Sequence, residues 1–430
     1  MVLLTACGGG GSNAGETGAG SSFSGSEAFS PPESGPGDSA TSEPNSNGDL
    51  NIPTTSPAPT PTNPPTATLT VGPGKQYAKP CQALAAAPNG ALVEIDGSVT
   101  YSGDVCAISA SNLTIRGVNG RPKIDAAGMN AQGKGTWVVQ GKGTVIENVE
   151  LSGAKVPDKN GAAIRLDGVD LTVRRSYLHD NENGILTNND GISNILIENT
   201  EFSRNGYGDG YSHNLYVGNV NSLTFRYNYT HDAKVGHNLK SRAKTNTIAY
   251  NRFSSTAGSG GQPSYEINLP NGGTSYVIGN IIQQPAANQN PNLLAYGEEG
   301  ATNPGQDLYV VNNTFINEAG NGTFVMLGSG VGTAALIQNN VFAGAGTITN
   351  QASATKKTNY QAAAPAFVDH LAYDLRPAAD APFLNTGSMP GSSSAGVPLA
   401  PTMQYVHPAS AKGRPAHTVV TPGAFEPATP

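Results

Sequence analysis

The sequence predicts an all-β solenoid in which short parallel strands stack rung upon rung. Three observations carry this prediction: strand-like segments recur at a regular interval, no helical period separates them, and the 430 residues include 54 Gly and 31 Pro. Periods of about 20–50 residues are typical of stacked-repeat proteins. Short strands between Gly and Asn turns exclude the helical and leucine-rich repeat types. The composition also disfavours a compact helical enzyme and a coiled coil.

The N-terminus resembles the end of a bacterial export signal. Leu4-Thr5-Ala6-Cys7 resembles a bacterial lipobox, in which the Cys becomes the lipid-modified first residue of the mature protein. A secretory signal needs a longer apolar stretch than the six residues before Cys7, so we expect a start assigned too late or a trimmed N-terminus. We therefore interpret residues 1–7 as the remnant of a lipoprotein signal. In a Gram-negative host, Gly8 after the Cys, rather than Asp, suits sorting to the outer membrane. We expect an exported protein that is anchored there or is extracellular.

Residues 8–68 form a low-complexity segment, rich in Gly and Ser at first and in Pro later. Such a segment buries too little apolar surface to offset the entropy of ordering it. It holds six acidic residues and no Lys or Arg, so the remainder of the chain is close to neutral although the net charge is −7. We expect a disordered spacer that holds a domain away from a membrane. With no basic stripe in the chain, nucleic-acid binding is disfavoured.

The ordered part is expected to begin with a cap and a first rung over residues 69–111. This segment contains Cys81 and Cys106, the two cysteines that remain besides Cys7. An even pair in an exported protein predicts a disulfide.

The repeat proper follows. Nine strand-like segments, most of them with a small polar residue after the alternating strand, are LTIRGV (113–118), VIENVEL (145–151), LTVRRSYL (171–178), ILIENTEF (195–202), LTFRYNYT (223–230), TIAYNRF (247–253), YVIGNII (276–282), LYVVNNTF (308–315) and ALIQNNVF (335–342). They recur every 23 to 33 residues. Three short strands per repeat predict a parallel β-helix, whose rungs must cover one another to complete a core. In the later repeats the polar residue is an asparagine, and we expect a stacked amide ladder at a turn: Asn228, Asn251, Asn280, Asn313 and Asn340.

Residues 69–426 resemble the right-handed parallel β-helices of the pectate-lyase-like superfamily. The opening VGPGKQY…CQAL…GALVEIDGSVTYSGDVC resembles the usual N-terminal cap, and APAFVD…YDLRP…APFLNTG with PGAFE (422–426) resembles the closing segment. The resemblance implies a β-helix over 112–346 and a closing segment over 347–430. It is less specific for chemistry, because the superfamily includes polysaccharide lyases, uronate epimerases, glycoside hydrolases and non-catalytic adhesins.

The third strand of each rung carries the candidate site. These strands are NGAAIRL (160–166), NGILTN (183–188), HNLYVG (213–218), HNLKSR (237–242), YEINLP (265–270) and NLLAYG (292–297). Because side chains alternate along a strand, residues on either side of the inward Ile and Leu column are expected to face solvent. The expected outward residues are His213, Asn214, Tyr216, His237, Asn238, Lys240, Arg242, Glu266 and Asn268.

This patch suits β-elimination on a uronate. A cation must neutralise the carboxylate while a base removes the C5 proton and an acid assists the leaving oxygen. We assign Arg242 to the carboxylate, Lys240 or His237 as base, and His213 and Tyr216 as their partners. The expected sugar contacts are Asn214, Asn238, Glu266, Asn268, Tyr211 and Lys234. A purely structural interpretation remains open, in which Lys240 and Arg242 are ordinary surface charges and the two histidines form a ladder bonded to turn backbone.

The expected function is thus a tethered, monomeric lyase that acts on an acidic polysaccharide. The alternatives are a β-helix hydrolase or epimerase that uses the same groove, or a non-catalytic glycan-binding or surface-structural protein. Paired carboxylates for hydrolysis would come from a second set: His179-Asp180, His231-Asp232, Glu182, Asp209 and Glu266. No cofactor is implied, and no Asp cluster indicates calcium.

Overall fold

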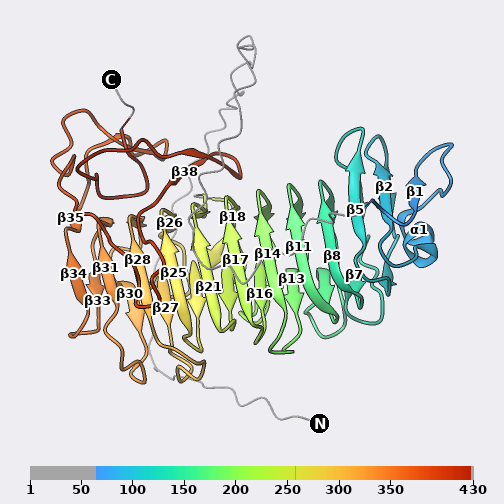
Figure 1. Ribbon diagram of the computed structural model, residues 1–430, viewed down its shortest axis with the longest axis horizontal. Coiled ribbons are helices and arrows are strands. Elements are labelled where there is room, and N and C mark those ends of the chain that lie inside the picture. The colour runs from blue at the N-terminus through green and yellow to red at the C-terminus, as the bar shows by residue number, and fades with distance from the viewer. Residues whose placement is uncertain (1–63, 257, 428–430) are drawn as a thin grey trace, which may run out of the picture. The chain divides into compact units, whose positions relative to one another are not determined.

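The computed structural model describes residues 64–256 and 258–427, and within them three parallel sheets wind into a β-helix (Figure 1). Cys7, its lipobox and most of the 8–68 segment lie outside the described residues. Each full rung runs from a strand of sheet A to one of sheet B and then one of sheet C. The described residues contain no helix with the length and apolarity needed to cross a bilayer.

Sheet A has twelve strands in chain order. They are β1 (Thr68–Val71), β2 (Leu92–Asp96), β5 (Thr114–Val118), β8 (Lys142–Glu147), β11 (Val169–Arg174), β14 (Asn194–Glu198), β17 (Ser222–Arg226), β21 (Thr245–Ala249), β25 (Thr274–Ile278), β28 (Leu308–Val311), β31 (Leu336–Gln338) and β34 (Thr355–Lys357).

Sheet B has eleven strands. They are β3 (Thr100–Ser102), β6 (Lys123–Asp125), β9 (Glu150–Ser152), β12 (Tyr177–His179), β15 (Glu201–Ser203), β18 (Tyr229–His231), β22 (Arg252–Ser254), β26 (Ile281–Gln284), β29 (Thr314–Asn317), β32 (Val341–Gly344) and β35 (Tyr360–Ala362).

Sheet C has ten strands and carries the candidate site. They are β4 (Cys106–Ile108), β7 (Gly135–Val139), β10 (Ala162–Leu166), β13 (Asn183–Thr187), β16 (Leu215–Val217), β20 (Leu239–Ser241), β24 (Ile267–Leu269), β27 (Leu294–Tyr296), β30 (Thr323–Leu327) and β33 (Thr347–Thr349).

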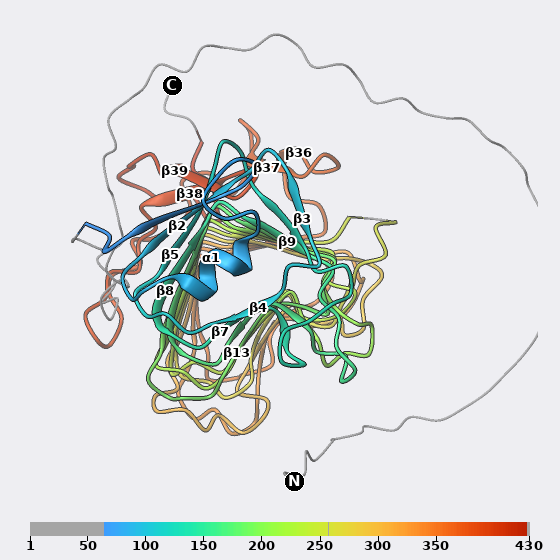
Figure 2. The same ribbon diagram turned by 90° about the vertical axis from the view of Figure 1, so that its right-hand side faces the viewer.

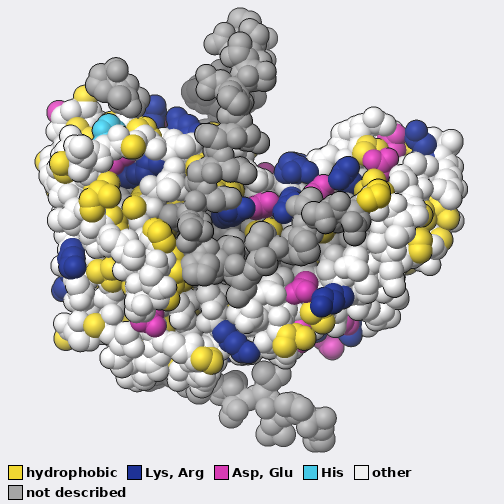
Figure 3. All heavy atoms as spheres, in the orientation of Figure 1, with side chains coloured by type: hydrophobic (Ala, Val, Ile, Leu, Met, Phe, Trp, Pro, Cys, Tyr) yellow, Lys and Arg dark blue, Asp and Glu magenta, His cyan; other side chains and the backbone are white. Residues whose placement is uncertain are grey.

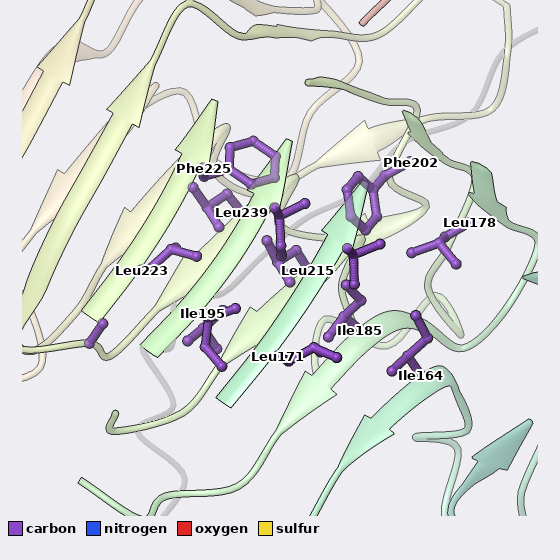
Figure 4. Close-up of a cluster of buried hydrophobic side chains, with 14 of the residues drawn as sticks. Ile164, Leu171, Leu178, Ile185, Ile195, Phe202, Leu215, Leu223, Phe225 and Leu239 are labelled. Atoms are coloured by element: carbon purple, nitrogen blue, oxygen red, sulfur yellow. The ribbon is translucent and has the colours of Figure 1, made fainter. Parts of the chain in front are cut away.

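The register confirms the predicted repeat. The first segment covers the sheet A strand β5, and each of the other eight spans a strand of sheet A, a tight turn and a strand of sheet B. From Ser176 onward, the small polar residue lies at this turn. The solenoid continues to β35, beyond the boundary at residue 346 that we expected from the sequence. Inside, the aliphatic and aromatic side chains of successive rungs stack in columns, including Ile164, Ile185, Leu215 and Leu239 (Figure 4).

The predicted amide ladder is present at the turn between sheets A and B. Each asparagine side chain donates from Nδ2 to the Oδ1 of the next rung, as from Asn251 to Asn280 at 2.9 Å and from Asn280 to Asn313 at 3.0 Å. The same Oδ1 also accepts a backbone N–H from the rung before, as Asn280 does from Asn251 at 2.9 Å. The ladder extends one rung further than predicted, to Asn359.

Segments outside the three sheets pack at the N-terminal end of the β-helix and on the outer faces of its later rungs. Helix α1 (Pro80–Ala86) lies across the N-terminal end, where Ala83 and Leu84 join the core (Figure 2). The predicted disulfide between Cys81 and Cys106 ties this helix to β4. After β35 the chain returns over the later rungs and forms two antiparallel hairpins, β36 (Phe367–Asp369) with β37 (Asp374–Pro377) and β38 (Met403–Val406) with β39 (Ser410–Gly413). Buried residues of these hairpins pack against the outer face of sheet B, and Val397 and Leu399 pack against sheet A.

Charged side chains form a regular column on the outer face of sheet A. At equivalent positions of successive strands the residues alternate in sign: Glu94, Arg116, Glu147, Arg174, Glu198 and Arg226. Arg174 lies 2.7 Å from Glu198 and 3.6 Å from Glu147, and Arg226 lies 2.9 Å from Glu198. Figure 3 shows one side of the molecule, with basic and acidic side chains intermixed across its middle.

Candidate functional site

Sheet C brings the predicted cations together on its outer face. Tyr216 on β16, Lys240 on β20 and Asn268 on β24 are paired in register, so they form one column across three rungs. Adjacent strands lie about 4.8 Å apart. Arg242 follows β20 directly and points to the same side as Lys240, as the alternation predicts. Both cations lie 6.0 Å from the centre of the Tyr216 ring.

Hydrogen bonds fix the Arg242 guanidinium in one orientation. Its Nε donates to the Tyr216 hydroxyl at 2.8 Å, and its Nη1 donates to Oδ1 of Asn271 at 2.6 Å. The third contact is to a carboxylate, because Nη2 lies 2.6 Å from Oε2 of Glu299. Arg242 is therefore a held, partly buried cation rather than a mobile surface charge.

Glu299 joins the two cations. Its other oxygen, Oε1, lies 3.1 Å from the Lys240 Nζ, so one carboxylate bridges Lys240 and Arg242. Partial burial acts to raise the pKa of Glu299, but the charge of Lys240 and the hydrogen bond from Arg242 outweigh it and hold that pKa below its usual value. The site thus stabilises an ionised carboxylate at this point.

The neighbouring Glu298 behaves differently. It is half-buried, and its Oε1 accepts a short hydrogen bond from the side-chain amide of Asn268, while its Oε2 is buried without a partner among the described residues. Burial raises the pKa of Glu298. Two adjacent carboxyl groups therefore have pKa values shifted in opposite directions, which is a frequent property of functional sites.

Glu298, Glu299 and Asn271 were not identified from the sequence. The glutamates lie in the turn after β27, one rung beyond Asn268, and fold back over the cations. A signal was available: two adjacent acids between glycines, Gly297-Glu298-Glu299-Gly300, at the place where Arg242 follows its own strand. Aligning the strands only as far as Gly297 stopped one residue short of it.

The histidines stack as a ladder bonded to backbone. Their rings lie 4.6 Å apart, and the Nδ1 of His213 accepts the backbone N–H of His237 at 3.0 Å. The Nδ1 of His237 accepts the N–H of Tyr265 at 3.3 Å. Burial, together with the charge of Lys240, lowers the pKa of His237 to about 3, and burial holds the pKa of His213 well below its usual value. Both rings are neutral at physiological pH, which favours the structural alternative.

Three of the residues expected to contact sugar face the interior of the protein. Asn214, Asn238 and Glu266 have no exposed surface, and they lie inside the turn between sheets B and C. There they continue a second amide ladder, in which Asn214 donates to Asn238 at 2.6 Å and Asn238 donates to Glu266 at 2.6 Å. The prediction extended strand alternation one residue too far, because the turn before β16, β20 and β24 rotates this position inward.

The other expected contacts lie on the surface or close to it. Tyr211 is 78% exposed in the loop before β16, and Lys234 is exposed in the turn after β18, against Gly206 of that loop. Asn268 lies on the outer face of sheet C but is covered by the Glu298 turn, with 1% exposure.

The second set of acids does not form a catalytic pair. On sheet B, His231 lies between two carboxylates, with Nδ1 2.6 Å from Asp232 and Nε2 3.1 Å from Glu201. His179 makes the same contacts two rungs earlier, with Asp180 and Glu150. Each ring nitrogen is already engaged.

The remaining acids of that set have local roles. Glu182 accepts two backbone N–H groups, at 2.7 and 3.0 Å, and Asp209 accepts the N–H of Tyr211 at 3.1 Å. Across the described ranges, no group of three or more His, Cys, Asp or Glu side chains is arranged to hold a metal ion.

Comparison with known proteins agrees with the topology. The solved structure of pectate lyase Pel9A superposes with a TM-score of 0.58, over 84% of this chain and 97% of that one. This chain has the pectate-lyase-like β-helix fold. At 16% identity, the likeness is one of fold alone.

Other β-helix enzymes match more weakly. A pectin methylesterase from Aspergillus niger and a mutant of the PL6 family alginate lyase AlyGC each give a TM-score of 0.36 at 13% identity. The methylesterase match covers 53% of this β-helix chain and 82% of the other, and the alginate lyase match covers 73% and 55%. No model of a known protein family matches the chain, and no curated protein matches it.

Proposed function

We propose that this β-helix protein is a polysaccharide lyase that cleaves a uronate-containing polysaccharide by β-elimination. The observation that carries the proposal is the convergence of Lys240 and Arg242 on one carboxylate at the outer face of sheet C. A uronate places its carboxylate next to the C5 proton, so a site that binds the first group also faces the second. The fold shared with pectate lyase Pel9A is consistent with this chemistry.

The reaction divides among three side chains. Arg242 binds the substrate carboxylate and stabilises the negative charge that develops when C5 loses its proton. Lys240 accepts that proton. The bond between C4 and the glycosidic oxygen then breaks, and the Tyr216 hydroxyl donates a proton to the leaving oxygen. The products are a new reducing end and a sugar with a C4–C5 double bond, and no water is consumed.

The surrounding residues take supporting roles in this proposal. His213 and His237, neutral and bonded to backbone, position the strands that carry Tyr216 and Lys240. Tyr211 and Lys234 extend the binding surface beyond the cations, with the Tyr211 ring available to stack on a sugar. We further propose that the enzyme is exported and tethered through a lipid on Cys7, for which the disulfide is supporting evidence, because disulfides persist in oxidising compartments.

Ultraviolet absorbance tests the reaction, because the unsaturated product absorbs and a hydrolysis product does not. We would assay polygalacturonate, alginate and other uronate polymers with the wild type, Lys240→Met and Lys142→Met. Lys142 is an exposed lysine on sheet A and serves as the matched control. Loss of a general base lowers the rate by about 10²–10⁴-fold. We expect that loss for Lys240→Met, an unchanged rate for Lys142→Met and equal melting temperatures for all three proteins.

Two results would count against the proposal. Absorbance that rises equally with Lys240→Met would remove Lys240 from the reaction. Reducing ends without absorbance would replace elimination by hydrolysis.

Hydrolysis is the second candidate because of the glutamate pair. Glu298, with its raised pKa, has the property of a general acid, and the ionised Glu299 has that of a base or nucleophile. Glu298→Gln distinguishes the two functions. A hydrolase would lose its activity, whereas the proposed lyase would retain Lys240, Arg242 and Tyr216 and most of its rate.

A further inference from the structure

The Lys240–Arg242 pair already holds a carboxylate from the protein itself. The two oxygens of Glu299 each contact one cation, at 3.1 Å to Lys240 Nζ and 2.6 Å to Arg242 Nη2. A substrate carboxylate that bound Arg242 beside Lys240 would need the same space. Glu299 and a uronate therefore compete for one position.

The Glu299 side chain can leave without unfolding its turn. The backbone of the turn is fixed, because the Glu299 N–H donates to Pro270 O at 3.0 Å and the Gly300 N–H donates to Gly297 O at 3.2 Å. The side chain, in contrast, is 44% exposed. Within the described ranges its carboxylate pairs with the two cations alone, so rotation into solvent breaks only those contacts.

Exchange of one carboxylate for another makes and breaks similar bonds. A single uronate unit that displaces Glu299 therefore gains little, and net affinity must come from further sugars that contact this face of sheet C. A neutral sugar gains nothing at this position, because it has no charge with which to replace Glu299. The arrangement selects for ligands that are both acidic and polymeric.

We propose that Glu299 is a built-in competitor for the carboxylate-binding position, and that it restricts binding at this face of sheet C to acidic oligosaccharides and polysaccharides. The inference rests on the proposed function in one respect only, namely that this face binds a uronate polymer. It does not require β-elimination. Glu299 is accordingly a specificity-determining residue that stays outside the bond-breaking step.

The test measures binding and turnover separately. Glu299→Gln keeps the shape of the side chain and removes its charge. The matched control is Glu198→Gln on sheet A, where the native carboxylate also contacts two cations, Arg174 at 2.7 Å and Arg226 at 2.9 Å. Both variants change the net charge equally. Affinity electrophoresis at pH 7 in gels with polygalacturonate, alginate or neutral dextran gives Kd for each protein, and melting temperatures confirm folding.

We expect Glu299→Gln to bind one acidic polymer about two- to tenfold more tightly than the wild type, as loss of a competitor with two partly exposed ion pairs implies. Glu198→Gln should bind as the wild type does, and dextran should retard none of the proteins. In steady-state kinetics, Glu299→Gln should lower KM and leave kcat within about twofold, because the competitor acts on binding alone.

Each contrary outcome overturns a defined part. Unchanged or weaker binding by Glu299→Gln, equal tightening by Glu198→Gln, or no binding of any acidic polymer by either the wild type or Glu299→Gln would refute the inference. A large fall in kcat would place Glu299 in the reaction itself, with the same result. Tighter binding without any unsaturated product would leave the inference standing and remove the lyase proposal. Unsaturated product with unchanged binding by Glu299→Gln would support the lyase proposal and refute the inference about Glu299.

Discussion

Replacement of the buried Glu266 by Gln should make the protein more stable at neutral pH. The Glu266 carboxyl ends the second amide ladder, has no exposed surface, and accepts one hydrogen bond, from Asn238. Its other oxygen, Oε1, is buried and finds no partner in the described part of the chain. Burial raises the pKa of Glu266 from 4.5 to about 8, so the folded protein keeps this side chain protonated at pH 7.

The sign and size of the effect follow from proton linkage. An acid with a raised folded-state pKa gives its full stability below pH 4.5, and that stability is lost as the pH rises to about 8, because only the folded state still binds the proton. At pH 7 the 2.5-unit gap from the unfolded pKa corresponds to about 3 kcal/mol. Gln accepts the same hydrogen bond from Asn238 and carries no such cost.

Urea unfolding at pH 4, 7 and 8.5 measures this difference. We expect equal free energies of unfolding for the wild type and Glu266→Gln at pH 4, and an advantage for the variant of about 3 kcal/mol at pH 7 that grows to about 5 kcal/mol at pH 8.5. Glu182→Gln is the matched control with the opposite sign. That buried carboxylate accepts two backbone N–H groups, so loss of its charge should destabilise the protein at pH 7. An advantage for Glu266→Gln that did not change with pH would refute the reasoning.

Four further predictions concern other parts of the molecule. Asn280→Ala should lower the free energy of unfolding by about 2–3 kcal/mol, because it leaves a buried backbone N–H and carbonyl of adjacent rungs unpaired; urea unfolding tests this, and an unchanged value would mean that the ladder adds no stability. Reduction of the Cys81–Cys106 bond should cost about 3 kcal/mol, seen as a lower melting temperature with reductant. Arg174→Met should cost about 2–3 kcal/mol at low salt, because two largely buried glutamates lose their shared partner; the same cost in high salt would contradict an ionic origin. Tyr216→Phe should lower kcat by about 10²-fold and leave polymer binding unchanged; a matching loss of binding would assign Tyr216 to substrate binding instead.

The fold was largely predictable because the repeat period is marked by residues that fit only one position of each rung. Asn228 to Asn340 recur at one turn position, where each amide pairs with the next rung. The inward aliphatic column of sheet C also followed directly from strand alternation. The inward rotation of Asn214, Asn238 and Glu266 could not be predicted in this way, because alternation applies within a strand and these residues lie at a turn.

The site was predictable only in part for a related reason. Lys240 and Arg242 share one strand end, so local sequence indicates that they lie together. Glu299 is far along the chain and reaches them because the turn after β27 folds back across a rung. The conformation of this turn depends on the tertiary contacts around Gly297 and Gly300. The spacing of residues in the sequence therefore does not predict it.

The alternating Glu and Arg column on sheet A has a consequence for how such a chain is assembled and how it evolves. Rungs otherwise look alike, and a slip by one rung would keep most aliphatic contacts. In this column, that slip would set Glu147 beside Glu198 and Arg174 beside Arg226, which like charges oppose. A slip by two rungs would restore every pair. The column therefore disfavours misfolded registers that are shifted by an odd number of rungs. It also implies that this stretch of the solenoid can lengthen by gene duplication only two rungs at a time.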